Sequence, residues 1–262
     1  MSIDSVAGPV RDVLVARRRA TLVITINRPD QRNAINAAVS AALAEAFAEL
    51  DESSELSVAV IHGAGRSFCA GMDLKAFARG ERTSVDRRGF AGLVEAPPVK
   101  PVIAAVEGWA LGGGFEIVLA CDLAVAGASA RFGLPEVKRG LAARGGGAFR
   151  LPRRVPYALA MEVLLTGEPL DAVRAERFGL INRIVPDGQA LNTALDLAKV
   201  IARNAPLSIA ATKRVVVQSA DWPVGREFEM QRVYLDPIFA SDDAREGAAA
   251  FRDRREPTWR GV

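Results

Sequence analysis

The sequence predicts an α/β domain followed by a helical C-terminal region. Short apolar stretches rich in β-branched residues alternate with glycine-rich turns and helical patterns over roughly the first 190 residues. No strand pattern occurs after Val185, and the segments that follow have helical spacing. We therefore divide the 262-residue chain into a core of ββα type at residues 1–190 and a helical region at residues 191–262.

The first elements are a predicted β-hairpin and an amphipathic helix. Residues 13–16 and 22–27 are rich in β-branched side chains, and the second stretch alternates as a half-buried strand does. Apolar residues recur at helical spacing from Ile35, and either Asn33 or Asn36 is available as the N-cap. The later predicted strands are residues 57–62, 102–106, 123–126, 130–132 and 181–185.

The stretch at residues 78–96 is polar, rich in arginine and only weakly periodic. We interpret it as a mobile helical segment that forms a lid or part of a pocket wall. The remaining helical patterns are residues 161–165, 173–178, 191–203, 207–220, 224–239 and 242–254.

Composition and charge argue against several classes of protein. The 34 basic and 31 acidic residues leave a net charge of +3, and arginine-rich patches such as residues 150–154 lack the interleaved aromatic residues of nucleic-acid binders. No apolar run approaches the roughly 20 residues of a membrane span, and the first 15 residues lack the apolar core of a signal peptide. We expect a cytoplasmic protein without nucleic-acid or membrane partners.

The few histidine and cysteine residues argue against a metal site. His62 is the single histidine and ends a strand pattern, so a histidine-based metal cluster is excluded. Cys69 and Cys121 lie far apart in apolar segments without CxxC spacing. We expect packed thiols and no bound metal.

Two glycine-rich loops, Ala70–Met72 and Gly112–Gly114, each follow a buried strand and lead toward a helix. Backbone amides at such turns have no partner within the element, and the helix dipole adds positive potential. Two such loops together would form an oxyanion hole. A phosphate-binding loop fits less well, because neither loop matches GxxxxGK[ST] and residues 63–68 lack the third glycine of GxGxxG. Either loop alone could be explained by tight turns and close packing.

Two glutamates accompany these loops. Glu116 follows the second loop at a helix start, and Glu136 comes 20 residues later, after a Gly-Leu-Pro turn. Paired carboxylates in different environments commonly perform general acid and base catalysis. The alternative is that Glu116 caps its own helix and that Glu136 is an ordinary surface residue.

Three segments resemble, in order and spacing, the signature segments of the enoyl-CoA hydratase/isomerase (crotonase) superfamily: FCAGMDLKAF, AVEGWALGGGFEIVLACDLAVAG and FGLPEVKRGL. NRPDQRNAIN, LTGEPLDAVRAERFGLINRIVP and SDDAREGAAAFRDRREPTW extend the resemblance over nearly the whole chain. It implies a crotonase-like spiral of ββα units whose C-terminal helices form trimers, usually stacked as hexamers.

The resemblance also implies a reaction. The amides of Met72 and Gly113 would form the oxyanion hole, and Glu116 and Glu136 match the two glutamates of the hydratase members. Such enzymes add water reversibly across the 2,3-double bond of a trans-2-enoyl-CoA to give a 3-hydroxyacyl-CoA, a step of fatty-acid β-oxidation. No metal or redox cofactor is expected. Coenzyme A is part of the substrate and is not counted as a cofactor.

Further positions match contacts to CoA in the family. Phe251 and Arg254 match C-terminal residues that reach CoA in a neighbouring subunit. Arg144 departs from the pattern, because the family usually has a small residue near the acyl group; we expect it either to turn outward or to meet a polar acyl substituent. The contacts expected within the chain are Arg32, Asn33, Ala34, Ala70, Asp73, Leu74 and Lys75.

Alternative functions remain open on the sequence. A carnitinyl-CoA dehydratase-like enzyme or a double-bond isomerase would keep the fold and change the substrate. An RNA-binding protein on this fold would use the arginine patches, although two retained glutamates and a small net charge argue against it.

Overall fold

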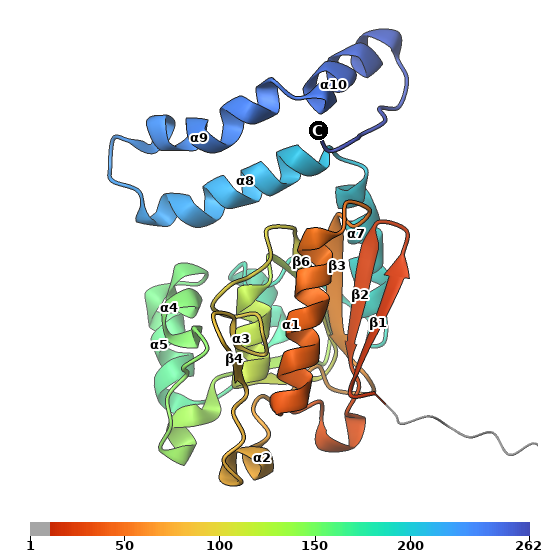
Figure 1. Ribbon diagram of the computed structural model, residues 1–262. Helices are drawn as coiled ribbons and strands as arrows, with labels where there is room; N and C mark the ends of the chain where they lie inside the picture. Colours follow the sequence, from red (N-terminus) through yellow and green to blue (C-terminus); the bar gives the residue numbers. More distant parts are fainter. Residues whose placement is uncertain (1–10) are drawn as a thin grey trace, which may run out of the picture.

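A six-stranded sheet with helices on both faces forms the centre of the computed structural model, which describes residues 11–262 (Figure 1). The strand order is β1-β2-β3-β6-β8-β11, and every neighbouring pair is parallel except β1 and β2. The strands are β1 (Val13–Arg18), β2 (Thr21–Ile26), β3 (Val58–Gly63), β6 (Val102–Val106), β8 (Leu123–Gly127) and β11 (Arg183–Val185).

Two smaller sheets complete the β-structure. Strand β9 pairs in parallel with β7 and antiparallel with β10, and β4 and β5 form a short antiparallel hairpin. Their bounds are β4 (Ser84–Val85), β5 (Gly89–Phe90), β7 (Trp109–Leu111), β9 (Arg131–Gly133) and β10 (Leu170–Asp171).

The helices lie between these strands and at the end of the chain. The α-helices are α1 (Ala37–Glu52), α2 (Leu74–Ala78), α3 (Gly113–Ala120), α4 (Gly147–Arg150), α5 (Tyr157–Thr166), α6 (Ala172–Arg177), α7 (Ala190–Ala202), α8 (Pro206–Gln218), α9 (Glu227–Phe239) and α10 (Asp242–Asp253). Short 3-10 helices span Pro29–Gln31, Pro135–Arg139, Leu151–Arg153 and Ser219–Asp221.

Alternation along the parallel strands separates two hydrophobic cores. In β3, Ala59 and Ile61 face the larger core, which also contains α1 and α3, whereas Val58 and Val60 face the core under α7. All four residues are fully buried. Burial on both faces explains why this strand is apolar throughout.

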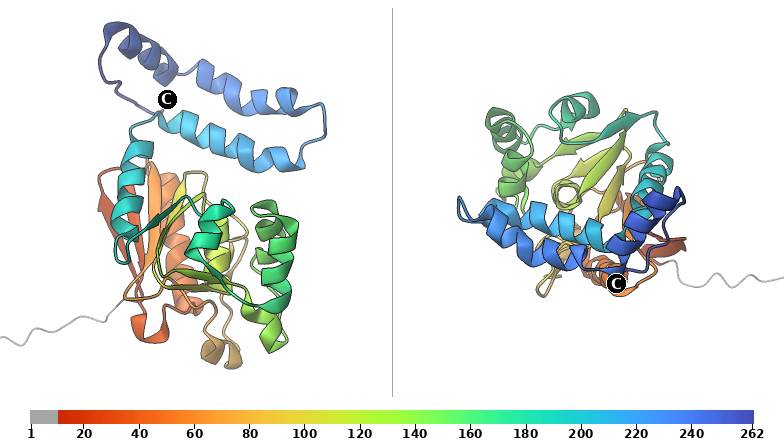
Figure 2. Two further views of the ribbon diagram at one scale, coloured as in Figure 1. Left: turned by 180° about the vertical axis from the view of Figure 1, so that it is seen from behind. Right: turned by 90° about the horizontal axis from the view of Figure 1, so that it is seen from above.

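Helices α8 to α10 form an arm that stands away from the sheet, as both Figure 1 and Figure 2 show. Helix α7, which begins at the predicted boundary near residue 190, packs on the sheet instead. A half-buried ion pair fixes the start of the arm, because Lys213 in α8 contacts Asp122 (2.6 Å) and donates to the Lys100 carbonyl.

Most elements agree with the sequence prediction, and the α/β fold is confirmed. Asn36 is the N-cap of α1, and its side chain accepts a 2.9 Å hydrogen bond from the Val39 amide. The interpretation of residues 78–96 as a helical segment is wrong. This segment contains the β4–β5 hairpin, and Ala91, Leu93 and Val94 are buried in the larger core.

The histidine and the two cysteines are packed as predicted. His62 lies at the end of β3, 2.8 Å from the Thr25 hydroxyl. Cys69 and Cys121 are buried free thiols, and burial raises the pKa of each to about 12. Within residues 11–262, no helix is long and apolar enough to cross a membrane, and no three His, Cys, Asp or Glu side chains are grouped for a metal.

Candidate active site

Two backbone amides meet at the start of α3. The loop before Met72 pairs with β7, since the Leu111 amide donates to the Cys69 carbonyl (3.0 Å). A Cβ atom built on Gly71 would lie only 3.0 Å from the Gly113 nitrogen, so the two glycine loops are in contact. Neither the Met72 amide nor the Gly113 amide donates a hydrogen bond to any residue in the range 11–262.

The glycines of both loops are required by this close approach. Gly71 has φ of +90°, a conformation that disfavours side chains. A Cβ on Gly114 would lie 2.2 Å from the Cys69 carbonyl oxygen, and a Cβ on Gly113 would lie 2.4 Å from the Phe90 ring. The amides therefore approach from backbone that has no room for side chains, at the positive end of the α3 dipole.

Glu116 lies in the first turn of α3 and is 4% exposed. Its Oε1 accepts a 2.9 Å hydrogen bond from the Gly147 amide, so this carboxylate caps α4 and not its own helix. Burial raises the pKa of Glu116, and the Glu136 carboxylate raises it further, whereas the Gly147 hydrogen bond and the charge of Arg150 lower it. The net direction is upward.

Glu136 is the second residue of the 3-10 helix that follows β9, and its Oε2 is buried without a hydrogen-bond partner in the described residues. Its Oε1 would lie 3.3 Å from a Cβ on Gly112, next to the Gly113 amide. Burial raises the pKa of Glu136 above its ordinary value, although the amide of Glu136 and the charge of Arg139 oppose this. The carboxyl is thus not an ordinary surface group.

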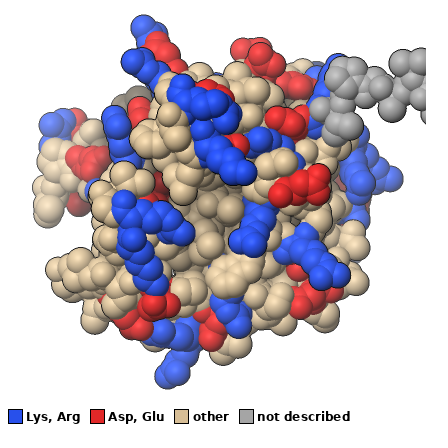
Figure 3. Space-filling model, turned by 90° about the horizontal axis from the view of Figure 1, so that it is seen from below, with Lys and Arg blue, Asp and Glu red and all other residues tan. Residues whose placement is uncertain are grey.

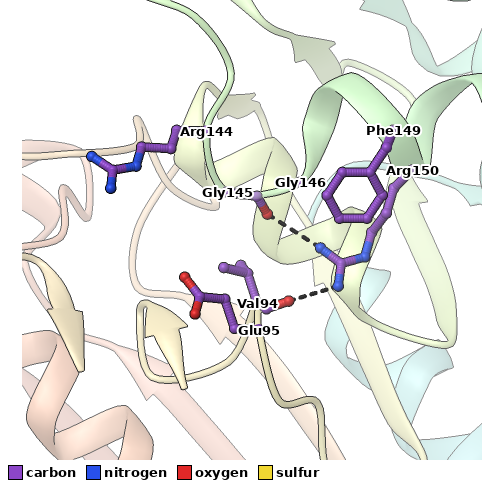
Figure 4. A pocket seen from close by; sticks show the side chains of 7 residues that line it. All are labelled: Val94, Glu95, Arg144, Gly145, Gly146, Phe149 and Arg150. Carbon is purple, nitrogen blue, oxygen red and sulfur yellow. Dashed lines mark hydrogen bonds between the residues drawn. The ribbon is translucent and has the colours of Figure 1, made fainter. Parts of the chain in front are cut away.

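A cavity of about 250 Å3 lies beside Glu116, because Gly145 lines it and also packs against the Glu116 carboxylate. Figure 4 shows the exposed Arg144 side chain directed away from Phe149 and Arg150. The complete lining is Val94, Glu95, Arg144, Gly145, Gly146, Phe149 and Arg150. The structure therefore puts Arg144 on the rim of this cavity.

The loop at residues 32–34 lies against the first glycine loop. The Arg32 carbonyl accepts from the Ala70 amide (2.9 Å), and the Ala34 carbonyl accepts from Arg28. Asn33 is fully buried, with its amide group bound to the carbonyls of Ala64 and Ser67. The Asn33 side chain thus shapes the loop from inside.

Helix α2 follows the Met72 loop directly. Asp73 caps it through the amides of residues 75 and 76 and forms an ion pair with Arg28 (3.2 Å). Although desolvation opposes it, these hydrogen bonds and the Arg28 charge lower the pKa of Asp73. Leu74 and Lys75 are exposed. Asp73 thus orients the helix, and the two exposed residues are the ones available to a ligand.

Phe251 and Arg254 lie at the far end of the molecule. Both are exposed on α10 or just after it, whereas α2 lies at the opposite end of the ribbon in Figure 1. They therefore do not meet the glycine loops of their own chain.

The sequence interpretation missed Gly147, Phe90 and Arg150. Arg150 belongs to the arginine-rich patch at residues 150–154, yet its guanidinium donates to the Val94 and Gly145 carbonyls. Arg154 likewise points inward, to the Cys121 carbonyl (2.7 Å). The available signal for Arg150 was its position between the apolar residues Phe149 and Leu151.

Comparison with known proteins gives the family. The sequence model of the enoyl-CoA hydratase/isomerase family matches residues 16–262. The chain belongs to this family. The crystal structure of the enoyl-CoA hydratase EchA1 from Mycobacterium marinum is 54% identical, has a TM-score of 0.95, and the match covers 97% of this chain and 100% of that chain. The crotonase fold is thereby confirmed.

Two curated members of the enoyl-CoA hydratase/isomerase family show the range of its activities. The enoyl-CoA hydratase EchA19 of Mycobacterium tuberculosis is 41% identical over 260 residues, covering 97% of both chains. The carnitinyl-CoA dehydratase of Salmonella paratyphi A is 41% identical over 255 residues, covering 94% of this chain and 97% of its own. Because the chain is 41% identical to both enzymes, sequence identity does not distinguish their acyl substrates, and the residues of the site have to do so.

Proposed function

We propose that the protein is an enoyl-CoA hydratase that adds water across the 2,3-double bond of a trans-2-enoyl-CoA. The observation that carries this proposal is that two backbone amides without an acceptor in residues 11–262, at Met72 and Gly113, lie near two carboxyl groups: the buried Glu116 and the half-buried Glu136, whose Oε2 is buried. Amides polarise a thioester carbonyl, and carboxyl groups move protons. Acyl-CoA hydration needs both.

In the proposed reaction, the thioester oxygen accepts hydrogen bonds from Met72 and Gly113. Glu116 takes a proton from water as the water oxygen bonds to C3, and the π electrons move to the thioester oxygen as an enolate. Glu136 then donates a proton to C2, which restores the thioester. Proton exchange with solvent then returns Glu116 to its ionised form and Glu136 to its protonated form.

The surroundings of the two glutamates support this division of roles. Burial gives Glu116 a raised pKa, but the Gly147 hydrogen bond and the Arg150 charge oppose that shift and favour its ionised form. Glu136 has a buried Oε2 without a partner among residues 11–262, which suits a protonated carboxyl that donates.

We further propose where CoA lies. Arg32, Ala34, Ala70, Leu74 and Lys75 surround the entrance, with Asp73 orienting α2. Figure 3 shows the face at this end of the molecule, on which lysine and arginine side chains lie on several sides of an uncharged central area. Such a distribution suits the phosphates of CoA around an apolar acyl entrance.

The arm supports a homotrimer, or a hexamer of two trimers. Helices α9 and α10 expose large apolar side chains that have no packing partner in the single chain of residues 11–262. A neighbouring subunit that covered them would also bring Phe251 and Arg254 toward a CoA site, as predicted. These side chains are Phe228, Val233, Phe239 and Phe251. A cytoplasmic location remains a prediction.

The test is to mix the purified protein with crotonyl-CoA and to follow the loss of the conjugated enoyl-thioester absorbance. Hydration that requires both Glu116 and Glu136 supports the proposal. No hydration, or full hydration by both Glu→Gln variants, contradicts it. Tight, salt-dependent RNA binding without turnover would favour the RNA-binding alternative.

A second candidate is a dehydratase acting on carnitinyl-CoA, favoured by the 41% identity to the Salmonella enzyme. The cavity wall supports it, because Glu95 and Arg144 give a charged lining that a plain hydrocarbon does not need. Comparing kcat/KM for carnitinyl-CoA dehydration with that for 3-hydroxybutyryl-CoA decides between the two. A double-bond isomerase is less suited, because it has no need of a water held by two carboxyl groups.

A further inference from the structure

We propose that Arg150 is a positioning residue that joins the oxyanion hole to the catalytic carboxylate, an inference that rests on the proposed hydratase function. Its guanidinium donates to two carbonyls from different segments: Nη2 to Val94 (2.6 Å) and Nη1 to Gly145 (3.2 Å). Figure 4 shows these two hydrogen bonds converging on the one side chain. Arg150 itself contacts neither the proposed thioester site nor the water.

The first hydrogen bond leads to the oxyanion hole. Val94 follows the β4–β5 hairpin, and its amide donates to the Phe90 carbonyl (3.3 Å). The Phe90 ring packs on the Cα of Gly113, where a Cβ would lie 2.4 Å from a ring carbon. Holding Val94 therefore holds Phe90, and Phe90 supports the backbone whose amide faces the thioester oxygen.

The second hydrogen bond leads to the catalytic carboxylate. Gly145 packs against Glu116, so that a Cβ on Gly145 would lie 2.5 Å from Oε2. Two residues later the Gly147 amide donates to Oε1 of Glu116, and between them the Gly146 carbonyl accepts from the Arg150 amide (2.9 Å). Arg150 thus fixes the loop that fixes the carboxylate.

The charge of Arg150 acts on the same carboxylate. Burial and the neighbouring charges of Arg154 and Arg153 lower the pKa of Arg150. Glu116 and Cys121 act in the opposite direction and raise it. The Arg150 charge in turn lowers the pKa of Glu116.

Other charged groups also face this region. Glu136 faces Glu116, and Glu95 and Arg144 line the adjoining cavity. Removing the Arg150 guanidinium should raise the pKa of Glu116 for two reasons, because the charge is lost and the Gly147 hydrogen bond is loosened.

The experiment compares Arg150→Met with Arg153→Gln in the full-length protein. Arg153 is the matched control, because it also lies over the Phe149 ring (5.8 Å against 5.0 Å) but is exposed and makes no hydrogen bond through its side chain within residues 11–262. For Arg150→Met we expect kcat for crotonyl-CoA hydration to fall by about tenfold to a hundredfold, as for other small displacements of reacting groups. KM should change by less than roughly threefold, since CoA contacts are retained.

The distinguishing readout is the pH profile of kcat/KM. In Arg150→Met the inflection that belongs to Glu116, identified by its loss in Glu116→Gln, should move to higher pH, whereas Arg153→Gln should leave it in place. Arg150→Lys keeps a charge and can reach one carbonyl, so it should restore part of kcat and part of the shift. A role confined to general stability would change the thermal midpoint without moving the inflection.

Two outcomes overturn the inference: an unshifted inflection with wild-type kcat in Arg150→Met, or equal effects in Arg150→Met and Arg153→Gln. If Arg150→Met does not fold by circular dichroism, Arg150→Lys provides the same test, and a wild-type profile in that variant overturns it. Carbon-13 NMR titration of the Glu116 carboxyl needs no turnover. Wild-type hydration tests the proposed function separately, so failure of one can be distinguished from failure of the other.

Discussion

The amide of Gly147 donates a 2.9 Å hydrogen bond to the Glu116 carboxylate. The donor is the first residue of α4, and the acceptor is in the first turn of α3, so one carboxylate satisfies the start of a helix other than its own. The proposed base is therefore held by the same contact that orders its neighbour. The Glu116 side chain therefore serves both the proposed reaction and the local stability of α4.

Replacing either glutamate by glutamine should remove hydration while keeping the fold. Because each carboxyl is proposed to move a proton, kcat for crotonyl-CoA should fall on the order of a hundredfold or more in Glu116→Gln and in Glu136→Gln. Glu162→Gln is the control, since Glu162 is an exposed carboxylate paired with Arg174 on the surface. The rate at which the enoyl-thioester absorbance is lost at saturating crotonyl-CoA gives kcat. Retained activity in both glutamine variants would contradict the assignment of Glu116 and Glu136 as proton-transferring groups.

Stability should depend on pH in the direction opposite to that of an ion-paired carboxylate. Burial raises the pKa of Glu116, so the folded state binds its proton more tightly than the unfolded state does. This group therefore makes its largest contribution below the ordinary value of 4.5, and the contribution is lost as pH rises through the raised pKa.

Glu116→Gln removes that ionisation and keeps an oxygen to accept from Gly147. Its thermal midpoint should exceed that of the wild type at pH 8, and the difference should shrink toward pH 5. A calorimetric series over this range tests the sign, and a variant less stable than the wild type at pH 8 would show that the carboxylate is net stabilising.

Gly71→Ala should disrupt the oxyanion hole. The added Cβ would lie 2.7 Å from the Leu111 carbonyl and 3.0 Å from the Gly113 nitrogen, so the two loops would have to separate. Gly80→Ala is the matched control, because Gly80 has nearly the same φ (+85° against +90°) but nothing within 4 Å of its Cβ position. The control should lose only about 1–2 kcal/mol through backbone strain. Urea unfolding measures the backbone strain in each variant, and kcat measures the loss of the oxyanion hole. Equal kcat values in Gly71→Ala and Gly80→Ala would argue against an oxyanion hole at this position.

Phe239→Asp on α9 should dissociate the proposed oligomer, since a charge at an apolar interface is not compensated. Phe239 is 82% exposed in the single chain. Val173→Asp serves as the control, because Val173 is 65% exposed on the surface of α6, which belongs to the α/β domain and not to the arm. Size-exclusion chromatography with light scattering gives the mass of the oligomer. An unchanged mass in Phe239→Asp would show that this part of α9 is not in the interface.

The sequence was sufficient for the strands of the central sheet and for most of the long helices, and it singled out the two glycine loops and the two glutamates proposed here as the site. The helix after Ile35 and the strand at residues 57–62 could be recognised because hydrophobic periodicity reports burial directly. Glu116 stood out because a carboxylate in an apolar segment requires a partner or a use. Its partner is the backbone amide of Gly147, which leaves no side-chain pattern to recognise.

The errors have a similar physical cause. Residues 78–96 contain polar side chains, yet the β4–β5 hairpin is held by contacts remote in sequence, such as the Ser40 hydroxyl donating to the Thr83 carbonyl (2.7 Å). Arg150 looked like surface charge because its acceptors are backbone carbonyls. Contacts to backbone from another segment depend on the tertiary fold, and periodicity does not encode them.

The burial of Cys69 has a chemical consequence for a protein that holds thioesters. Cys69 lies two residues before Gly71 in the first glycine loop, and its thiol has a pKa raised to about 12. Only a thiolate attacks a thioester efficiently, and this thiol stays protonated at physiological pH. At this position in the first glycine loop the protein therefore presents no thiolate to the acyl group of a bound CoA ester.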